Sequence, residues 1–168
     1  MSAREPVTAQ PYLRSDTRPG VSWSSLLRRV AESKTFWLAT SRTGPPHVMP
    51  LLAVCVEEKI YFCAGPKTQK ARNLARDSRC VLTTAAEGVD VVVEGRAVRV
   101  TDSGTLVRAA HAYRAKYGWD AEPGEDAFYG DGAPTAGPAP LHLYELVLER
   151  VFGFGTDESL NAMRWTFD

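Results

Sequence analysis

The spacing of apolar residues changes several times along the chain and divides it into elements. Residues 1–20 show no period and contain three prolines, whereas Trp23, Leu26, Leu27 and Val30 form the stripe of a helix that Ser22 can cap. Strand-like segments then follow at residues 35–42, 47–56, 60–64, 79–86, 89–100 and 141–154. Short turns join most of them, so we expect neighbouring strands to pair antiparallel.

Two more helices are expected between these strands. Residues 67–76 are good helix formers, and Leu106, Ala110, Tyr113 and Tyr117 recur at helical spacing after the possible caps Asp102 and Ser103. Residues 118–140 are rich in glycine and proline and are expected to form a long loop. The pattern predicts a mainly β (α+β) fold, an antiparallel barrel with peripheral helices, because closing a sheet removes its exposed edges. Residues 1–20 are expected to be a flexible N-terminal arm and residues 21–168 a single domain.

Single residues refine this prediction. Pro50 interrupts its strand and should lie at an edge, at a bulge or where pairing is broken, because proline donates no backbone hydrogen bond. Gly95, in the middle of a long strand, predicts a bend or bulge. Tyr144, Leu146, Leu148, Phe152 and Phe154 alternate and are expected on one face of the last strand. The aromatic residues Trp37, Tyr61, Phe62 and Trp165 are interpreted as core residues rather than as a stacking platform for bases.

Charge and composition exclude several classes of protein. Lys plus Arg and Asp plus Glu are both 20, so the formal net charge is zero and a nucleic-acid partner is not expected. Cys55, Cys63 and Cys80 lie in apolar runs without metal-ligand spacing, which is typical of reduced, buried cysteines in a cytoplasmic protein. The sequence has no secretory leader and no apolar run of about 20 residues, so we expect neither export nor membrane insertion.

One local charge excess points to chemistry. Between residues 67 and 79 five basic residues face one acid, Asp77. The first of them, Lys67, follows the Gly65-Pro66 stop and opens a helix, whose free N–H groups and dipole suit an anion. Thr68 adds a hydroxyl, and Lys70 lies on the same side as Lys67. On charge alone a solvated basic helix face remains the alternative.

The order of segments resembles a known family. WLATSRTGPPHVMPLLAV, then IYFCAGPKTQKARNLARDSRCVL, then VVVEGRAVRV are similar to the pyridoxamine 5′-phosphate oxidase-like split-barrel proteins. That family includes FMN-binding proteins and actinobacterial oxidoreductases that use the deazaflavin coenzyme F420. The resemblance implies a six-stranded antiparallel split β-barrel that works as a homodimer. The Arg/His set that binds the substrate's phosphate in the vitamin-producing oxidase is missing near the C-terminus, so pyridoxamine phosphate is not the expected substrate.

The resemblance also assigns site residues. It places the cofactor phosphate on Lys67, Thr68, Lys70 and Arg72. It lays the flavin ring along the backbone of Met49, Pro50, Leu51 and Leu52. It gives Arg164 and Trp165, near the C-terminus, a place in the pocket of the neighbouring subunit. Arg76 and Arg79 suit the longer acidic tail of the deazaflavin if they face the same groove.

Two classes of function follow. The first is an FMN- or deazaflavin-dependent oxidoreductase that reduces a small organic substrate by hydride transfer. The second is a non-catalytic protein that binds or carries a flavin or haem, with haem the less favoured ligand. His47, His111 and His142 are interpreted as structural or solvated, and no catalytic triad or metal site is expected.

Overall fold

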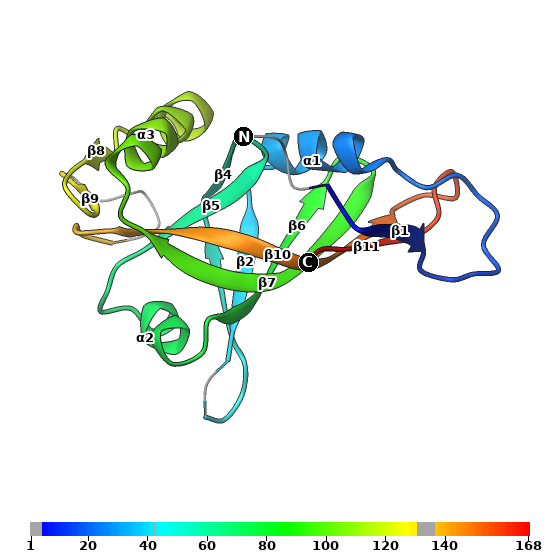
Figure 1. Cartoon of the computed structure of the whole chain (residues 1–168), viewed down its shortest axis with the longest axis horizontal. Helices are drawn as coiled ribbons and strands as arrows, with labels where there is room; N and C mark the ends of the chain where they lie inside the picture. Colours follow the sequence, from blue (N-terminus) through cyan, green and yellow to red (C-terminus); the bar gives the residue numbers. More distant parts are fainter. Residues whose placement is uncertain (1–4, 42, 131–136) are drawn as a thin grey trace.

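A curled antiparallel sheet forms the body of the protein (Figure 1). The computed structural model describes residues 5–41, 43–130 and 137–168. The helices are α1 (Trp23–Glu32), α2 (Gln69–Arg76) and α3 (Ser103–Tyr117). The strands are β1 (Thr8–Pro11), β2 (Phe36–Thr40), β3 (His47–Leu51), β4 (Ala53–Val56), β5 (Lys59–Ala64), β6 (Arg79–Ala86), β7 (Val89–Val100), β8 (Glu122–Pro123), β9 (Phe128–Tyr129), β10 (His142–Gly155) and β11 (Met163–Thr166).

The long strand β10 joins two parts of the sheet. It pairs with β7 along almost its whole length, with β5 through its first half and with β11 through its second half. The main path runs β1-β11-β10-β7-β6-β2-β3, and β4 pairs only with β5. The expected mainly β fold with antiparallel strands and three helices is confirmed. In the described ranges, none of the helices is long and apolar enough to cross a membrane.

The expected strand over residues 47–56 is two strands. The ladder breaks at Leu52, so that β3 pairs with β2 while β4 turns to pair with β5. Pro50 lies in β3 opposite Trp37, and β3 ends the path of the sheet. The prediction that Pro50 lies at an edge is therefore confirmed, because its missing N–H faces no further strand.

A register shift in β10 lies beside Gly95. The pairing with β7 moves by one residue between Leu148 and Arg150, and Gly95 is opposite Leu148. A Cβ at Gly95 would lie 2.1 Å from the carbonyl oxygen of Val147, so only glycine allows this approach. A bulge therefore lies beside Gly95, but its extra residue, Glu149, is in β10 and not in the strand of Gly95 where it was predicted.

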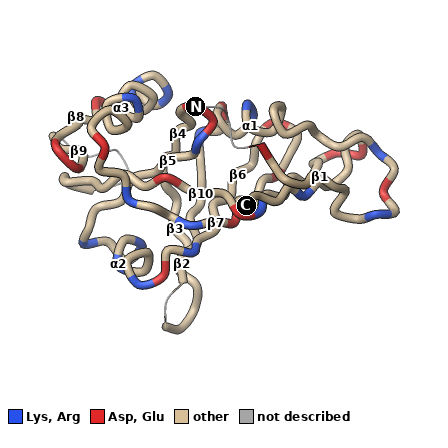
Figure 2. The backbone as a smooth tube through the Cα atoms, in the orientation of Figure 1, with Lys and Arg blue, Asp and Glu red and all other residues tan. Residues whose placement is uncertain are grey.

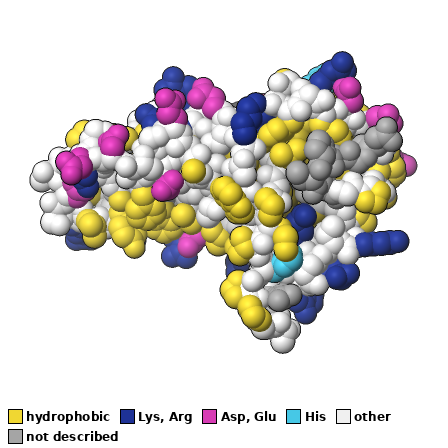
Figure 3. All heavy atoms as spheres, turned by 180° about the vertical axis from the view of Figure 1, so that it is seen from behind, with side chains coloured by type: hydrophobic (Ala, Val, Ile, Leu, Met, Phe, Trp, Pro, Cys, Tyr) yellow, Lys and Arg dark blue, Asp and Glu magenta, His cyan; other side chains and the backbone are white. Residues whose placement is uncertain are grey.

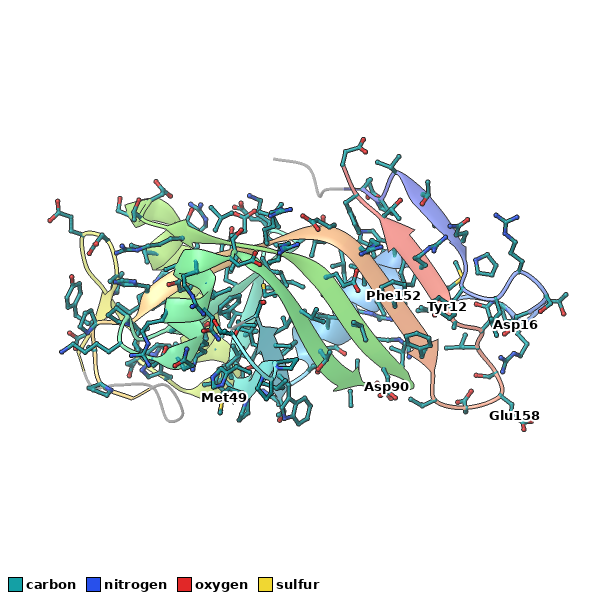
Figure 4. All side chains as sticks on the ribbon, turned by 90° about the horizontal axis from the view of Figure 1, so that it is seen from below. Tyr12, Asp16, Met49, Asp90, Phe152 and Glu158 are labelled. Carbon is teal, nitrogen blue, oxygen red and sulfur yellow. The ribbon has the colours of Figure 1, made fainter. Side chains whose placement is uncertain are left out.

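The register shift also reverses which side chains in the second half of β10 point into the barrel. Tyr144, Leu146 and Leu148 are buried as expected, but Val151 takes the next inward position. Phe152 and Phe154 therefore lie on the outer face, and their expected place beside Leu148 is wrong. Tyr12 packs edge-on against Phe152, with ring centroids 5.9 Å apart, on that face (Figure 4).

The protein has two apolar cores. One fills the barrel and includes Phe36, Phe62 and Trp165. The second lies between α3 and the strands β4, β5 and β10, where Tyr113 and Phe128 are fully buried. Phe128 belongs to the expected loop 118–140, whose described residues pack on α3 and form the small β8–β9 ladder. Residues 131–136 of that loop lie outside the described residues.

The described part of the expected N-terminal arm is bonded to the C-terminal segment. β1 pairs with β11, as Figure 1 shows, and Asn161 donates its side-chain N–H to the Arg18 carbonyl oxygen at 2.6 Å. Gly20 lies so close to Met163 that a Cβ there would be 2.3 Å from its sulfur. The described part of the expected arm is therefore draped along the C-terminal segment, because β11 offers it a strand edge.

Candidate functional site

The segment after β5 forms a capped helix start. Thr68 is the N-cap of α2: its hydroxyl accepts from the Ala71 N–H at 3.3 Å and donates to the Gly65 carbonyl oxygen at 2.8 Å. In this arrangement the only proton of the Thr68 hydroxyl bonds the Gly65 carbonyl oxygen, so the expected contact of Thr68 with a phosphate stays a prediction. Its contribution is to fix the geometry of the helix start.

A buried amide fixes α2 against the β2–β3 hairpin. Asn73 is fully buried, donates to the Thr40 hydroxyl at 2.9 Å and accepts from the Gln69 side chain at 2.7 Å. Since Lys70 precedes Asn73 by three residues, both lie on the same side of α2. The sequence pattern did not single out Asn73, although a polar residue on the buried stripe of a short helix is a usable signal.

Lys70 is a buried cation. Its exposure is 8%, and no carboxylate or other hydrogen-bond partner contacts it among the described residues. Burial lowers the pKa of Lys70 below its usual value, which is the expected direction for an ammonium group that keeps some contact with solvent but has lost part of its water without gaining a counter-charge. Buried charges in proteins are normally paired, so this position suits an anionic ligand.

Other donors surround the same helix start. Arg72 folds back and donates to the Lys67 carbonyl oxygen at 2.9 Å and to the Gln69 side chain at 3.0 Å. Lys67 itself is exposed. The backbone N–H groups of Gln69 and Lys70 have no partner among the described residues, as is usual in a first helical turn. Figure 2 shows the basic residues gathered on α2 next to β2 and β3. The arrangement can bind a phosphate dianion through two amides and up to three cations.

The expected ring-binding residues occupy different surroundings. Met49 alternates onto the same face of the hairpin as Thr40, against which α2 packs, and it is 42% exposed. It lies at the margin of the molecule in Figure 4. Pro50 points to the opposite, outer face beside Trp37. Leu51 is buried, and Leu52 packs against the second core. The structure therefore places Met49 and Leu51 on the face of the hairpin against which α2 packs, Pro50 on the opposite face and Leu52 at the second core.

Two cavities flank α2. One, of about 410 Å³, lies at its C-terminal end and is lined by Thr40, Ser41, Arg79 and Glu94 among others. The second, of about 400 Å³, lies between α2 and the β7–β10 pair, with Pro66, Arg99, His142 and Tyr144 in its wall. Arg79 is paired with Asp77 at 2.7 Å and Arg99 with Asp126 at 2.7 Å, so neither is a free cation.

Arg164 and Trp165, the two expected site residues near the C-terminus, lie in different surroundings. Trp165 is 1% exposed and packs on Trp23 in the core of its own chain, with ring centroids 5.8 Å apart. Its expected place in a neighbour's pocket stays a prediction, and the position of the side chain in the core of its own chain does not favour it. Arg164 lies on the outer face, opposite Phe152, where the Gln10 side chain accepts from its Nε at 3.2 Å.

An unexpected apolar residue lies on that outer face. Trp37, interpreted as core from its strand pattern, is 41% exposed, because its strand presents Leu38 and Phe36 to the barrel instead. The other three aromatics of that set, Tyr61, Phe62 and Trp165, are buried as expected. Sequence alternation alone could not say which of two apolar rows faces inward.

The cysteines and acidic residues supply no competing site. Burial raises the pKa of Cys63 and of Cys80 to about 12, so both stay protonated and unreactive near neutral pH. Within the described ranges, no group of three His, Cys, Asp or Glu side chains could hold a metal ion.

The family model for pyridoxamine 5′-phosphate oxidase matches residues 25–153, a span that contains both α2 and the β2–β3 hairpin. The chain belongs to this family. No curated protein shows significant sequence similarity to this family member. Its fold is shared by a conserved hypothetical protein of Mycobacterium tuberculosis, at 19% identity and a TM-score of 0.63, with 85% of this chain and 90% of that chain covered.

Two further solved structures with this fold are of proteins described by the ligand that they bind. A haem-binding protein of Mycobacterium smegmatis is 19% identical over 81% of this chain, with a TM-score of 0.62, and this chain spans 55% of its length. An FAD-binding protein of Mesorhizobium loti is 18% identical over 88% of this chain and 96% of that chain, with a TM-score of 0.57. Similarity at this level establishes the common fold of the oxidase family and leaves the ligand of this member open.

Proposed function

We propose that this protein binds a phosphate-bearing flavin, FMN or the deazaflavin coenzyme, with the phosphate at the start of α2. The observation that carries the proposal is Lys70, a cation with 8% exposure and no described partner, next to two free amides. A phosphate would supply the missing counter-charge and accept hydrogen bonds from both amides. The fit of these residues to a phosphate is independent of any similarity to other proteins.

Each residue has a separate part in this proposal. Lys70 and the N–H groups of Gln69 and Lys70 bind the phosphate. Arg72 and exposed Lys67 add charge at its solvent side, and Thr68 fixes the turn. The free edge of β3 next to Met49 offers backbone groups to the ring. A bound flavin ring supplies a position that accepts or donates a hydride, and the protein's task is to orient it and shield it from water.

The charges favour FMN slightly over the deazaflavin. The deazaflavin's acidic tail needs cations beyond the phosphate site, and Arg79, an expected contributor, is paired with Asp77 through both carboxylate oxygens. Arg76 remains exposed at the end of α2. A single phosphate is matched by the groups at the helix start alone.

We propose an oxidoreductase that passes a hydride between the bound flavin and a small organic substrate. A carrier of flavin or haem is the second candidate, favoured by the haem-binding protein that shares the fold. An enzyme must hold a substrate next to the bound ring, whereas a carrier need not. Only the enzyme therefore requires open space beside the ring. The two cavities near α2, one past its C-cap Asp77 and one against its Ala71 and Leu74, offer room for a substrate and so support the enzyme.

We also propose that the protein forms a homodimer through the outer face of the sheet. A row of residues crosses five strands there: Pro50, Trp37, Thr83, Val92 and Phe152. Figure 3 shows apolar side chains spread over this side, from the β1–β11 end to the hairpin of β2 and β3. Exposed apolar rows of this kind mark association sites. Trp37→Glu should therefore shift the mass measured by light scattering from dimer to monomer, and an unchanged mass would contradict this interface.

A visible-spectrum titration tests the proposed function. Purified protein is titrated with FMN, with the deazaflavin coenzyme and with haem, and then reduced and mixed with quinone, enone or nitro acceptors. The proposal predicts a perturbed flavin spectrum and reoxidation by at least one acceptor. A spectrum unchanged by either flavin would refute the flavin site, whereas tight binding without any reoxidation would favour the carrier.

A further inference from the structure

A second lysine, far from α2, has surroundings that suit covalent chemistry. Lys116 is in the last turn of α3, and its Nζ donates to the Ala53 carbonyl oxygen at 2.8 Å. The nitrogen lies 4.8 Å from the centre of the Phe36 ring and 5.2 Å from that of Tyr117. No carboxylate pairs with it in the part of the chain that the structure describes.

Lys116 lines a cavity of about 300 Å³ whose other walls are small and apolar. The cavity lies where α1 and α3 approach β4, on the side of the barrel away from α2, as Figure 1 shows for these elements. Its lining consists of Ala31, Val54, Cys55, Ala112, Ala115 and Lys116. Lys116 is therefore the one basic residue in the wall of a small apolar space, and its amine lies beside that wall, at the Ala53 carbonyl and the Phe36 ring.

These surroundings favour the uncharged amine. Burial is the largest cause and lowers the pKa of Lys116 to about 8; the nearby charge of Lys34 acts in the same direction, and Cys55 acts against it. The Cys55 thiol and the faces of the Phe36 and Tyr117 rings act the other way and favour the charged amine. Burial raises the pKa of the Cys55 thiol to about 11 and that of Tyr117 to about 12, so neither group carries a negative charge at pH 7.5. A lysine desolvated in an apolar pocket is the usual form of a nucleophilic amine.

We propose that Lys116 is a reactive amine that forms an imine with a small, neutral, apolar aldehyde held in this cavity. The Nζ–C bond forms, the C=O double bond breaks, and the carbonyl oxygen leaves as water with the two protons of the neutral amine. No oxidant or reductant takes part. The alanine walls admit an uncharged aldehyde and offer no counter-charge to an anionic one. This site is independent of the flavin site, because its residues come from α1, β4 and α3.

Trapping experiments test the assignment. Wild-type protein is treated at pH 7.5 with benzaldehyde and cyanoborohydride, which delivers the hydride that converts an imine into a stable secondary amine. Peptide mass spectrometry then compares Lys116 with the other four lysines of the chain and with the N-terminus. The difference between a pKa of about 8 and the ordinary 10.5 raises the neutral fraction about 200-fold, so Lys116 should be labelled at least ~10-fold faster than Lys34 even after its lower intrinsic nucleophilicity is counted. Equal labelling of the two lysines would overturn the proposal.

Two variants separate reactivity from structure. Lys116→Arg keeps a cation near Ala53 and Phe36 but has no nucleophilic amine; it should lose the fast labelling phase and keep the wild-type melting temperature. Ala112→Leu fills the cavity and leaves the amine in place, so it should slow labelling of Lys116 at least fivefold. Unchanged labelling in Ala112→Leu would contradict the role of the cavity, and fast labelling that persists in Lys116→Arg would assign the reactive amine elsewhere.

Discussion

Replacing Lys70 by methionine separates binding from stability. Methionine has a similar length and shape but no charge. If Lys70 is the buried partner of a phosphate, Lys70→Met should weaken FMN binding by about 1.5–3 kcal/mol, the usual value of a hydrogen bond to a charged group. That corresponds to a Kd raised about 10- to 150-fold. Quenching of FMN fluorescence on titration with protein measures both constants.

The same substitution should stabilise the protein without ligand. The Lys70 side chain has 8% exposure and its ammonium has no described partner, so removal of this partly desolvated charge should raise the free energy of unfolding by up to about 1 kcal/mol at pH 7. Urea denaturation of the two proteins without FMN measures this difference.

The pH dependence gives an independent check. Because the folded pKa of Lys70 lies below its ordinary 10.5, the unfolded chain binds the proton more tightly. The wild type is therefore destabilised most below the folded pKa and recovers as pH rises towards 10.5. The stability gained by Lys70→Met should shrink over that window.

Arg76→Met is the matched control. It removes one positive charge from the exposed end of the same helix, so it should change FMN affinity less than threefold and leave stability near that of the wild type. The reasoning is refuted if Lys70→Met binds FMN as tightly as the wild type, or if it is less stable than the wild type at neutral pH.

Three further substitutions test the surrounding structure. Thr68→Ala removes the N-cap of α2 and should cost about 1 kcal/mol in urea denaturation; an unchanged midpoint would mean that the cap contributes nothing. Gly95→Ala places a Cβ 2.1 Å from the Val147 carbonyl oxygen and should cost about 1–3 kcal/mol, whereas wild-type stability would contradict the close approach at the bulge. Trp165→Ala should cost about 3–5 kcal/mol in thermal denaturation, because its side chain is in the core; lost cofactor binding at full stability would instead restore the role in a neighbour's pocket.

Much of the fold could be predicted from periodicity and from two special residues. Pro50 and Gly95 act through the backbone alone, so their consequences, an edge strand and a bulge, follow from the residue type. The inward or outward direction of a row was harder to predict. Trp37 and Phe152 are apolar residues in alternating strands, and their direction depends on the register shift and on which row meets the barrel centre.

The location of the candidate site could be predicted from the sequence, but the role of each residue in it could not. A Gly-Pro stop followed by basic residues located the helix start correctly. The pattern did not show that Thr68 would use its hydroxyl as a cap, nor that Lys70 would be buried while Lys67 stayed exposed. These outcomes depend on how α2 packs on the hairpin through Asn73 and Thr40, which is a long-range contact.

A comparison of FMN with riboflavin tests the central claim most directly. Riboflavin has the same ring but no phosphate, so the difference in affinity reports the phosphate site at the start of α2. Wild-type protein is titrated with both, and with the deazaflavin coenzyme and its phosphate-free form. The account predicts that the phosphate-bearing compound of at least one pair binds tenfold or more tightly than its partner and is displaced by inorganic phosphate. Equal binding within both pairs, or no binding of any of the four, would contradict it.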